Sequence, residues 1–458
     1  MNTKFINCFF AGICVVSYTS KMKAQNDHRP NIIFILTDDM GYSDVGVYGG
    51  KFVPTPNIDR MASEGIYFNQ YYSASPISSP SRAGLLTGMH PARWNITSYL
   101  QTRKGNRDAE MADFLDPNAP TIPKAMKAAG YKTGHFGKWH LGGGRDVKNA
   151  PVFDAYGYDE YASTYESPAA DPLLTATDWI WSPQDSIKRW DRTAYFVDKT
   201  IDFLKKHKGE PCFINLWPDD MHTPWVGNIE EQDIVPHDYQ SEKNFCTVLT
   251  EYDKQIGRLL NEIKKLNLDN NTIVIFASDN GPAPSFRGSR AGNLRGCKAS
   301  LFEGGTRLPF IVWDTKGAVP QGKSDNTSVV SALDMFKSLC AIAGTPLPEG
   351  YRSDGTDMSK ALLGKELKRD KAIFWEYRRN DSEAFPKPKG EDASPNVAVR
   401  KGDWKLLVNK DGSDVMLYDL YKNPRENVNV AEKYPEVTKE LKKLALDWRN
   451  SLPELPRK

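Results

Sequence analysis

Residues 31–37 read NIIFILT, and two acidic residues, Asp38 and Asp39, follow this run directly. Such a dense apolar run is typical of a strand that is buried on both faces, as the strands of parallel sheets are. A second run, TIVIFAS at residues 272–278, has the same character and also ends at an acidic residue. Both runs therefore predict buried strands of a mainly parallel sheet.

Helical patterns separate the predicted strands. Thr55 followed by Pro56 is typical of a helix start and Gly65 of a helix end, and residues 121–130 repeat this pattern. Apolar residues at helical spacing then precede the strands CFINLW (212–217) and TIVIFAS, namely Val197, Ile201 and Leu204, then Tyr252, Ile256, Leu259 and Ile263. This alternation predicts an α/β fold with a large doubly wound domain.

The pattern changes near residue 365. Four short strands are expected there, at Ala372–Tyr377, Val397–Arg400, Trp404–Val408 and Val415–Leu420. A terminal helix follows, with Val437, Leu441, Leu444 and Trp448 on one face. We therefore expect a large domain over residues 25–365, and a small C-terminal domain with an antiparallel sheet and a helix over residues 366–458.

Residues 142–190 interrupt the regular alternation and are rich in Tyr, Trp, Pro and Asp. A long irregular insertion in a regular domain is more often a functional wall than a spacer, and packing over the core is the alternative.

The first residues are typical of a secretory signal peptide. Lys4 precedes an apolar run, Phe5 to Val16, and small and polar residues continue to about Ala24. The run is shorter than the ~20 residues that cross a bilayer. We expect cleavage after residue 24 and export, to the periplasm or as a secreted protein.

Composition and charge limit the possible partners. The chain has 458 residues, of which 40% are hydrophobic, and a formal charge of +2, which falls to −1 once the three lysines of the signal peptide are removed. Such a balance argues against a protein that binds nucleic acid through bulk charge. The mature chain has no further apolar run of ~18 residues, so no stable membrane insertion is expected. Four cysteines remain, too few for a disulfide scaffold: Cys212, Cys246, Cys297 and Cys340.

Acidic and amide side chains follow the two buried strands. Asp38 and Asp39 come after the first strand, and Asp279 and Asn280 come after the second. Active sites of open α/β sheets gather at the carboxyl ends of strands, so these side chains should converge. Carboxylates held together repel each other, and a hard divalent cation such as Ca²⁺ or Mg²⁺ relieves that repulsion through oxygen ligands. Either pair taken alone could instead cap a helix rather than bind a metal.

Residues 78–88 read SSPSRAGLLTG. Ser78 is expected just before a helix N-terminus, where backbone N–H groups favour an anion, and Arg82 follows four residues later. Other basic candidates are Lys138 and His140 in the sequence GKWH, Lys298, and His222 soon after strand 212–217. Three further basic residues could bind additional anionic groups of a ligand, namely Arg287, Arg290 and Arg295, and a solvated basic loop is the alternative.

Together these segments resemble the type I, formylglycine-dependent sulfatases of the alkaline-phosphatase-like superfamily. The family signature runs Cys or Ser, any residue, Pro, Ser, Arg, followed by Thr-Gly, and residues 78–88 match it. The other matches occur in the family's order and include Asp38-Asp39, GKWH at 137–140, Asp279-Asn280-Gly281, Lys298 and Glu303-Gly304-Gly305. The resemblance covers nearly the whole mature chain, including Trp404–Leu406 and Leu417–Leu420.

The resemblance implies a role for each matching residue. Ser78 would be oxidised to formylglycine, whose hydrate attacks sulfur and forms a covalent sulfo-enzyme intermediate. Ca²⁺ would be bound by Asp38, Asp39, Asp279 and Asn280, with modified Ser78 completing the shell. Arg82 would hold the nucleophile, and Lys138 and Lys298 would bind sulfate oxygens. His140 would deprotonate the hydrate, and His222 would protonate the leaving group.

The resemblance also implies partners. The substrate would be a sulfated glycan or sugar. Aromatic rings of the insertion could stack on the faces of its sugar rings. Most family members encode Cys at the first signature position, whereas this chain encodes Ser, so an anaerobic-type maturation enzyme is expected to act on it. The alternatives are a phosphomonoesterase or phosphodiesterase of the same superfamily, and an inactive sulfated-glycan-binding protein that keeps Ser78 unmodified.

Overall fold

The computed structural model describes residues 29–177, 179–228, 238–268, 271–314, 318–378 and 388–453. The expected signal peptide, residues 1–24, lies outside the described residues. Within the described part of the chain, every helix is too short or too polar to cross a membrane. Cys212, Cys246, Cys297 and Cys340 are free thiols.

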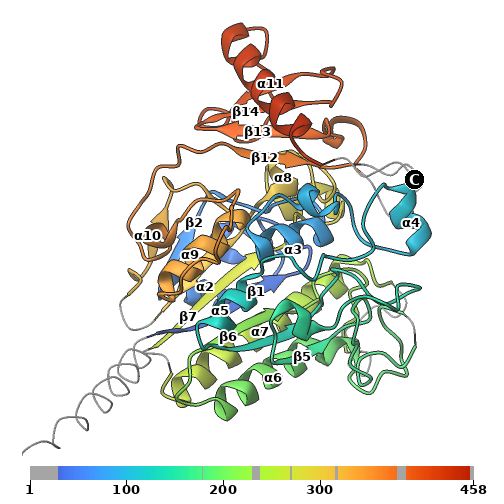
Figure 1. Ribbon diagram of the computed structural model, residues 1–458, viewed down its shortest axis with the longest axis vertical. Coiled ribbons are helices and arrows are strands. Elements are labelled where there is room, and N and C mark those ends of the chain that lie inside the picture. The colour runs from blue at the N-terminus through green and yellow to red at the C-terminus, as the bar shows by residue number, and fades with distance from the viewer. Residues whose placement is uncertain are drawn as a thin grey trace, which may run out of the picture.

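An eight-stranded sheet forms the centre of the described chain, in the order β10-β2-β9-β7-β1-β6-β4-β5 (Figure 1). Neighbouring strands are parallel except at β9, which is antiparallel to both β7 and β2. The prediction of an α/β fold with a mainly parallel sheet is therefore confirmed. The strand bounds are β1 (Asn31–Thr37), β2 (Ile66–Phe68), β4 (Lys132–Gly137), β5 (Glu160–Ser163), β6 (Cys212–Trp217), β7 (Thr272–Ser278), β9 (Phe310–Trp313) and β10 (Lys323–Asp325).

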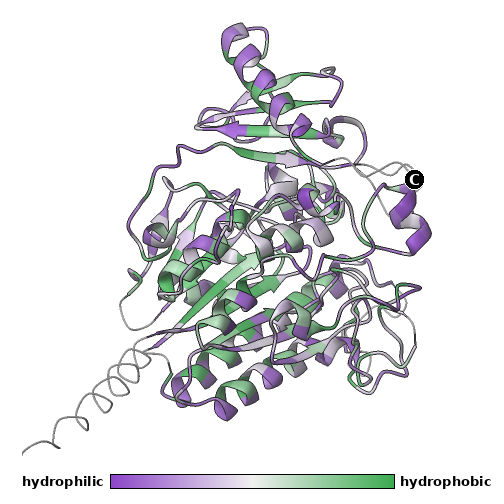
Figure 2. Cartoon of the chain, viewed as in Figure 1, coloured by the Kyte–Doolittle hydropathy of each residue, from purple (hydrophilic) through white to green (hydrophobic). Residues whose placement is uncertain are grey.

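Helices cover both faces of this sheet because each central strand is apolar on both faces. Ile33 and Ile35 of β1 pack in one core with α2 (Pro56–Ser63), α6 (Arg192–Lys206) and α7 (Glu242–Lys265). Ile32, Phe34 and Leu36 pack in a second core with α3 (Ser78–Thr87), α5 (Ile122–Ala128) and α9 (Met335–Ile342). Figure 2 shows the central strands in green and the outward helix faces in purple. Successive side chains of β1 thus point alternately into the cores on the two faces of the sheet.

Several shorter elements complete the large body. A three-stranded sheet has the order β11-β3-β8, with β3 (Tyr71–Tyr72), β8 (Arg307–Leu308) and β11 (Val330–Ser331). The short helices are α4 (Arg103–Asp108), α8 (Glu303–Thr306) and α10 (Ser359–Leu362).

The C-terminal sheet is antiparallel, as predicted, and has the order β12-β13-β14-β15. One face packs against α11 (Pro435–Asn450). The other face contributes Trp375, Leu407 and Tyr418 to a core with Ile77 and Phe302, so it supports the segments on either side of the site described below. The bounds are β12 (Ile373–Glu376), β13 (Val397–Lys401), β14 (Trp404–Val408) and β15 (Met416–Asp419).

The insertion at residues 142–190 is less irregular than expected. It supplies β5, which extends the main sheet by pairing with β4. Phe153, Tyr156 and Tyr158 are fully buried in the core, whereas Tyr165 and Trp179 line a cavity. The segment therefore has both of the roles considered for it, core packing and a cavity wall.

A buried ion cluster joins the small sheet to the large body. Lys405 Nζ on β14 lies 2.9 Å from Glu303 Oε1 and 3.1 Å from Glu426 Oε1, and all three side chains have zero exposure. Burial raises the pKa of Glu426 to about 7 even though Lys405 opposes this shift. Lys405 is therefore the cation that contacts both buried carboxyl groups, and Arg307 adds a second contact to Glu303 at 3.5 Å.

We expect Lys405→Met to lower the free energy of unfolding by about 3–5 kcal/mol, because it removes the ion-pair partner of buried Glu426 and leaves Glu303 only with Arg307, at 3.5 Å. Lys401→Met is the matched control, since Lys401 pairs with Glu440 at the surface and each side chain is at least half exposed. Its effect should stay within about 0.5 kcal/mol. Denaturant unfolding measures both values, and equal effects of the two substitutions would contradict the role of the cluster.

Candidate active site

The carboxyl ends of β1 and β7 bring three carboxylates together. The strands pair in parallel with Thr37 opposite Ser278, so the residues that follow each strand are neighbours. Asp38, Asp39 and Asp279 are buried, and each has a carboxylate oxygen within 4.8 Å of the others. The convergence expected from the sequence is therefore present.

Two more oxygen atoms face this cluster. Ser78 is the first residue of α3, and its Oγ lies 3.2 Å from both Asp38 Oδ1 and Asn280 Oδ1. Asn280 is held in place by its Nδ2 group, which donates to Asp39 Oδ1 at 2.7 Å. Carboxylate, amide and hydroxyl oxygens are the ligands that Ca²⁺ takes, so the donor set fits a hard divalent cation.

Three basic side chains surround the carboxylates. Arg82, one turn after Ser78 on α3, donates to Asp279 Oδ2 through Nε (3.0 Å) and Nη2 (2.7 Å). Lys138 Nζ donates to Asp38 Oδ2 at 2.8 Å, and Lys298 Nζ donates to Asp39 Oδ2 at 2.7 Å. Each carboxylate thus has a cationic partner in the described structure.

The charges of this cluster are strongly coupled. Burial by itself would raise the pKa of Asp38, but Lys138, His222 and Arg82 hold that pKa well below its usual value. At Asp279 burial outweighs the attraction of Arg82, and the pKa rises to about 6. Asp279 is therefore the carboxylate whose charge is least well compensated, and a nearby divalent cation would stabilise its ionised form.

His222 lies on the loop after β6. Its Nδ1 is 2.5 Å from the carbonyl oxygen of Thr223, which only accepts hydrogen bonds, so Nδ1 carries the proton. Its Nε2 lies 3.1 Å from Lys298 Nζ and 3.6 Å from Asp39 Oδ2. Burial, followed by Lys298, lowers the pKa of His222, so the ring is neutral and Nε2 accepts from the lysine.

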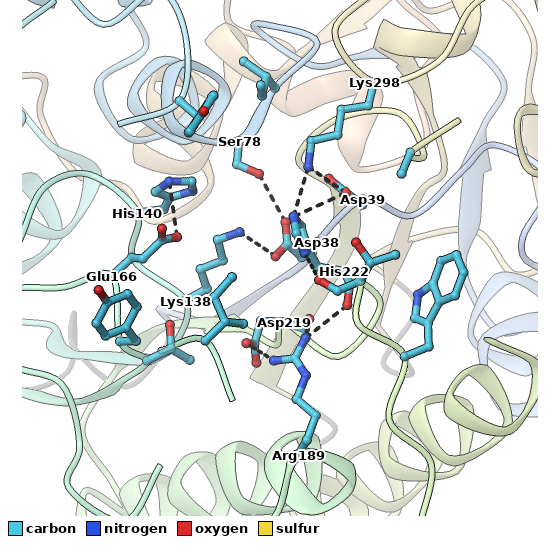
Figure 3. Close-up of a pocket in the computed structure, with 18 of the residues that line it drawn as sticks. Asp38, Asp39, Ser78, Lys138, His140, Glu166, Arg189, Asp219, His222 and Lys298 are labelled. Carbon is cyan, nitrogen blue, oxygen red and sulfur yellow. Dashed lines mark hydrogen bonds and ion pairs between the residues drawn. The ribbon is translucent and has the colours of Figure 1, made fainter. Parts of the chain in front are cut away.

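His140 lies on the opposite side of the cavity from Lys298 (Figure 3). Its Nε2 is 3.1 Å from the carbonyl oxygen of Leu100 and 3.3 Å from Glu166 Oε2. Burial lowers the pKa of His140 to about 3, although Glu166 opposes this shift. The imidazole is therefore neutral at physiological pH.

All of these groups meet at a cavity of about 640 Å³. Seven of the predicted residues line it, namely Asp38, Asp39, Ser78, Lys138, His140, His222 and Lys298. Arg82, Asp279 and Asn280 lie behind them and contact them. Aromatic rings form much of the wall, from Tyr99, Tyr165, Trp179, Trp225 and Phe286. The cavity thus combines charged groups of both signs with aromatic side chains.

Four charged residues of the cavity were not predicted, Arg145, Glu166, Arg189 and Asp219, and Figure 3 labels the last three. Arg189 Nη1 is paired with the Asp219 carboxylate, and Nη2 donates to the carbonyl oxygens of Asp219 (2.7 Å) and His222 (3.1 Å). Arg189 therefore fixes the loop that carries His222. Asp219 follows a buried strand as Asp38 does, so the same sequence rule would have found it. Glu166 and Arg189 lie in the insertion, where no periodic pattern marks them.

The suggestion that Arg290 and Arg295 receive anionic ligand groups is wrong. Arg290 is fully buried, with Nη2 2.7 Å from Asp44 Oδ2 and from the carbonyl oxygen of Asp39. Arg295 donates to the hydroxyl of Tyr418 and to the carbonyl oxygen of Glu426, so it helps to attach the C-terminal sheet. Arg287 is not among the described residues that line the cavity.

Comparisons with known proteins agree with this architecture. The family model described as Sulfatase matches residues 30–345, and the model described as N-sulphoglucosamine sulphohydrolase, C-terminal, matches residues 297–451. An N-acetylgalactosamine-6-O-sulfatase from Bacteroides thetaiotaomicron is 31% identical over 500 residues, covering 93% of this chain and 94% of that protein. The human N-acetylgalactosamine-6-sulfatase is 32% identical over 382 residues, covering 77% of this chain and 69% of that protein.

Solved structures give the same result. A 6S-sulfatase from the glycosaminoglycan metabolism of Bacteroides thetaiotaomicron has a TM-score of 0.74 at 27% identity, covering 92% of this chain and 100% of that chain. Ps i-CgsB, solved in complex with a neocarrahexaose, has a TM-score of 0.73 at 26% identity, covering 93% of this chain and 94% of that chain. Because the sulfatase model matches most of the chain and these relatives span nearly all of it, the chain belongs to the sulfatase family.

Proposed function

We propose that this sulfatase hydrolyses the sulfate ester of a sulfated carbohydrate, with 6-O-sulfated N-acetylgalactosamine as the substrate class. The observation that carries the proposal is the position of Ser78, whose Oγ contacts the same acidic cluster that Lys138 and Lys298 contact, in a cavity lined by aromatic side chains. The relatives named for N-acetylgalactosamine 6-sulfate support the choice of sugar. Aromatic side chains suit it as well, because their apolar faces pack on sugar rings.

The proposal includes one divalent cation, Ca²⁺, and the oxidation of Ser78 to formylglycine by a dedicated maturation enzyme. Asp38, Asp39, Asp279 and Asn280 would hold the cation, together with modified Ser78. When present, the two groups supply a nucleophilic aldehyde hydrate beside a Lewis acid.

The basic residues offset the charge of the ester. A sulfate monoester is an anion and repels an anionic nucleophile, so positive charge must surround it. Lys138 and Lys298 each border the cavity and are paired with a carboxylate. A divalent cation held by Asp38 and Asp39 would balance their charge, and the two ammonium groups would then be available to bind sulfate oxygens. Arg82, anchored on Asp279, would orient the residue at position 78.

His222 would protonate the leaving group. A sugar alkoxide leaves poorly without a proton, so a general acid is needed. The ring of His222 is neutral beside Lys298, but an anionic ester bound nearby would raise the pKa of His222 and favour the imidazolium. His140, on the other side of the cavity, would act as the base.

A two-metal phosphatase is less well supported. Enzymes of that kind hold their metals about 3.5–4 Å apart and need ligands for both. Among the described residues, the only group of three or more His, Cys, Asp or Glu side chains with metal-ligand spacing is the aspartate cluster. A single cation site therefore favours the sulfatase reaction.

We propose that residues 1–24 direct export to the periplasm, and that residues 25–365 and 366–458 form the two domains. Export would give the enzyme access to glycans outside the cytoplasm.

We expect Ser78→Ala to reduce turnover of N-acetylgalactosamine 6-sulfate below about a thousandth, because Ala cannot become an aldehyde. Ser75→Ala is the control, since Ser75 Oγ is buried and has no hydrogen-bond partner among the described residues. Mass spectrometry of the peptide that contains Ser78 should show the loss of one hydrogen molecule in active protein. Sulfatase activity that persists in the Ser78→Ala variant would exclude this mechanism.

His222→Ala should affect substrates unequally. We expect kcat/KM to fall by about 10²–10⁴ on a sugar sulfate, whereas the fall on 4-nitrophenyl sulfate should be below about tenfold, because a nitrophenolate leaves without protonation. His207→Ala serves as the control, since His207 pairs with Glu160 and Glu210 outside the cavity. Equal losses on the two substrates would argue against a general acid at this position.

A further inference from the structure

Glu166 lies beside His140 on the cavity wall and contacts it twice. Its Oε2 is 3.3 Å from His140 Nε2, and its backbone carbonyl accepts a hydrogen bond from the His140 N–H at 3.0 Å. Its other carboxylate oxygen, Oε1, accepts from Arg145 Nη2 at 2.8 Å. Figure 3 shows the carboxylate directed at the His140 ring. The residue is thus held in place from both sides.

The surroundings of His140 Nε2 determine which ring nitrogen carries the proton. The two groups within hydrogen-bonding distance are the carbonyl oxygen of Leu100 and the Glu166 carboxylate, at 3.1 and 3.3 Å. Burial would raise the pKa of Glu166, but His140, Lys138 and Arg145 lower it to about 2, so this carboxylate is ionised. Both neighbours therefore only accept, and Nε2 must be the donor.

The second ring nitrogen is in a different environment. His140 Nδ1 is buried and has no hydrogen-bond partner among the described residues. The ring is neutral, because burial lowers its pKa to about 3. With the proton on Nε2, the lone pair is on Nδ1. A buried acceptor without a partner is costly unless a ligand or a reacting group supplies the missing donor.

We propose that Glu166 is a positioning residue that fixes His140 as the Nε2–H tautomer and leaves Nδ1 as the proton acceptor of the reaction. This inference rests on the proposed function for its chemistry. With formylglycine at position 78, a hydroxyl O–H bond of its hydrate would break, an N–H bond would form at Nδ1, and the electron pair would stay on oxygen. The resulting imidazolium would be stabilised by the Glu166 carboxylate at Nε2. In other nucleophile–base pairs a third group orients the base in the same way.

The arrangement requires a carboxylate at position 166. Oε1 faces a donor of Arg145 and Oε2 faces a donor of His140, so both oxygens must accept. A glutamine at this position has the same shape but only one acceptor oxygen. If that oxygen faces Arg145, the amide N–H groups face Nε2 and favour the opposite tautomer, against the carbonyl oxygen of Leu100, which still accepts from Nε2. Glu166→Gln therefore tests tautomer control with little change in packing.

The direct test is ¹⁵N NMR of histidine-labelled protein with unmodified Ser78, in which ring signals are assigned by comparison with His140→Asn. We expect the wild-type His140 ring to show a protonated, pyrrole-type Nε2 and an unprotonated, pyridine-type Nδ1. In Glu166→Gln, the Nδ1 signal should move toward the protonated position. A wild-type ring protonated at Nδ1, or ring signals that Glu166→Gln leaves unchanged, would overturn the proposal.

Kinetics with matured protein and 4-nitrophenyl sulfate gives the second readout. We expect Glu166→Gln to lower kcat about 100-fold, within the range of general base catalysis, and to leave KM within about twofold. Glu160→Gln is the matched control, because Glu160 also pairs with a histidine, His207 Nε2 at 3.0 Å, but lies outside the cavity. Its kcat should not change. A normal kcat in Glu166→Gln, or a loss confined to KM, would also overturn the proposal.

The two experiments separate this inference from the proposed function. The NMR measurement needs no formylglycine and no substrate, so it reports the tautomer even if the protein is not a sulfatase. Absence of sulfatase activity in matured wild-type protein would instead contradict the proposed function.

Discussion

The mutual repulsion of three buried carboxylates is the constraint on which the site depends. Asp38, Asp39 and Asp279 have oxygens within 4.8 Å of one another and are shielded from water. In such surroundings like charges are expensive unless cations lie close to them. Arg82, Lys138 and Lys298 supply that charge from three separate parts of the chain. The same residues place positive charge around Ser78, so the requirement for stability and the requirement for anion binding coincide.

The fold explains how distant segments of the chain bring the carboxylates and the basic residues together. The parallel register of β1 and β7 places the carboxylates, and the first turn of α3 places Ser78 and Arg82. The loop that carries Lys298 depends on the C-terminal part of the chain. Ser300 Oγ donates to the carbonyl oxygen of Asp392, and Leu301 N–H donates to Ser394 Oγ, both at 2.8 Å. The segment before β13 thus supports the site without lining the cavity.

Much of this architecture could be predicted from the sequence. The bounds of β1, β6, β7 and β14 agree with the sequence patterns, because strands buried on both faces appear as continuous apolar runs. Nine of the ten candidate site residues could be found because they lie in segments that match the family or directly after such strands, and His222 is the tenth. Two-residue strands such as β3 and β8 have no recognisable pattern, and they were not predicted.

The residues that were missed have a common physical reason. Glu166 and Arg189 lie in the insertion, where side-chain positions are set by tertiary contacts rather than by a helical or strand period. Arg290 and Arg295 were misassigned because a sequence shows charge but not burial, and both are paired inside the protein. Contacts between distant segments, such as Glu166 with His140, become visible only once the chain is folded.

Calcium binding tests the central claim most directly. Titration calorimetry of chelator-treated protein should show one Ca²⁺ per chain, and calcium at 100 times its Kd should stabilise the fold by about 2.7 kcal/mol. Asp39→Asn is the sharpest comparison, because Asp39 has a φ of 57° that asparagine also tolerates, so the substitution removes charge and keeps the backbone. It should weaken binding and remove the stabilisation. Two bound Zn²⁺ ions and no response to calcium would contradict the account.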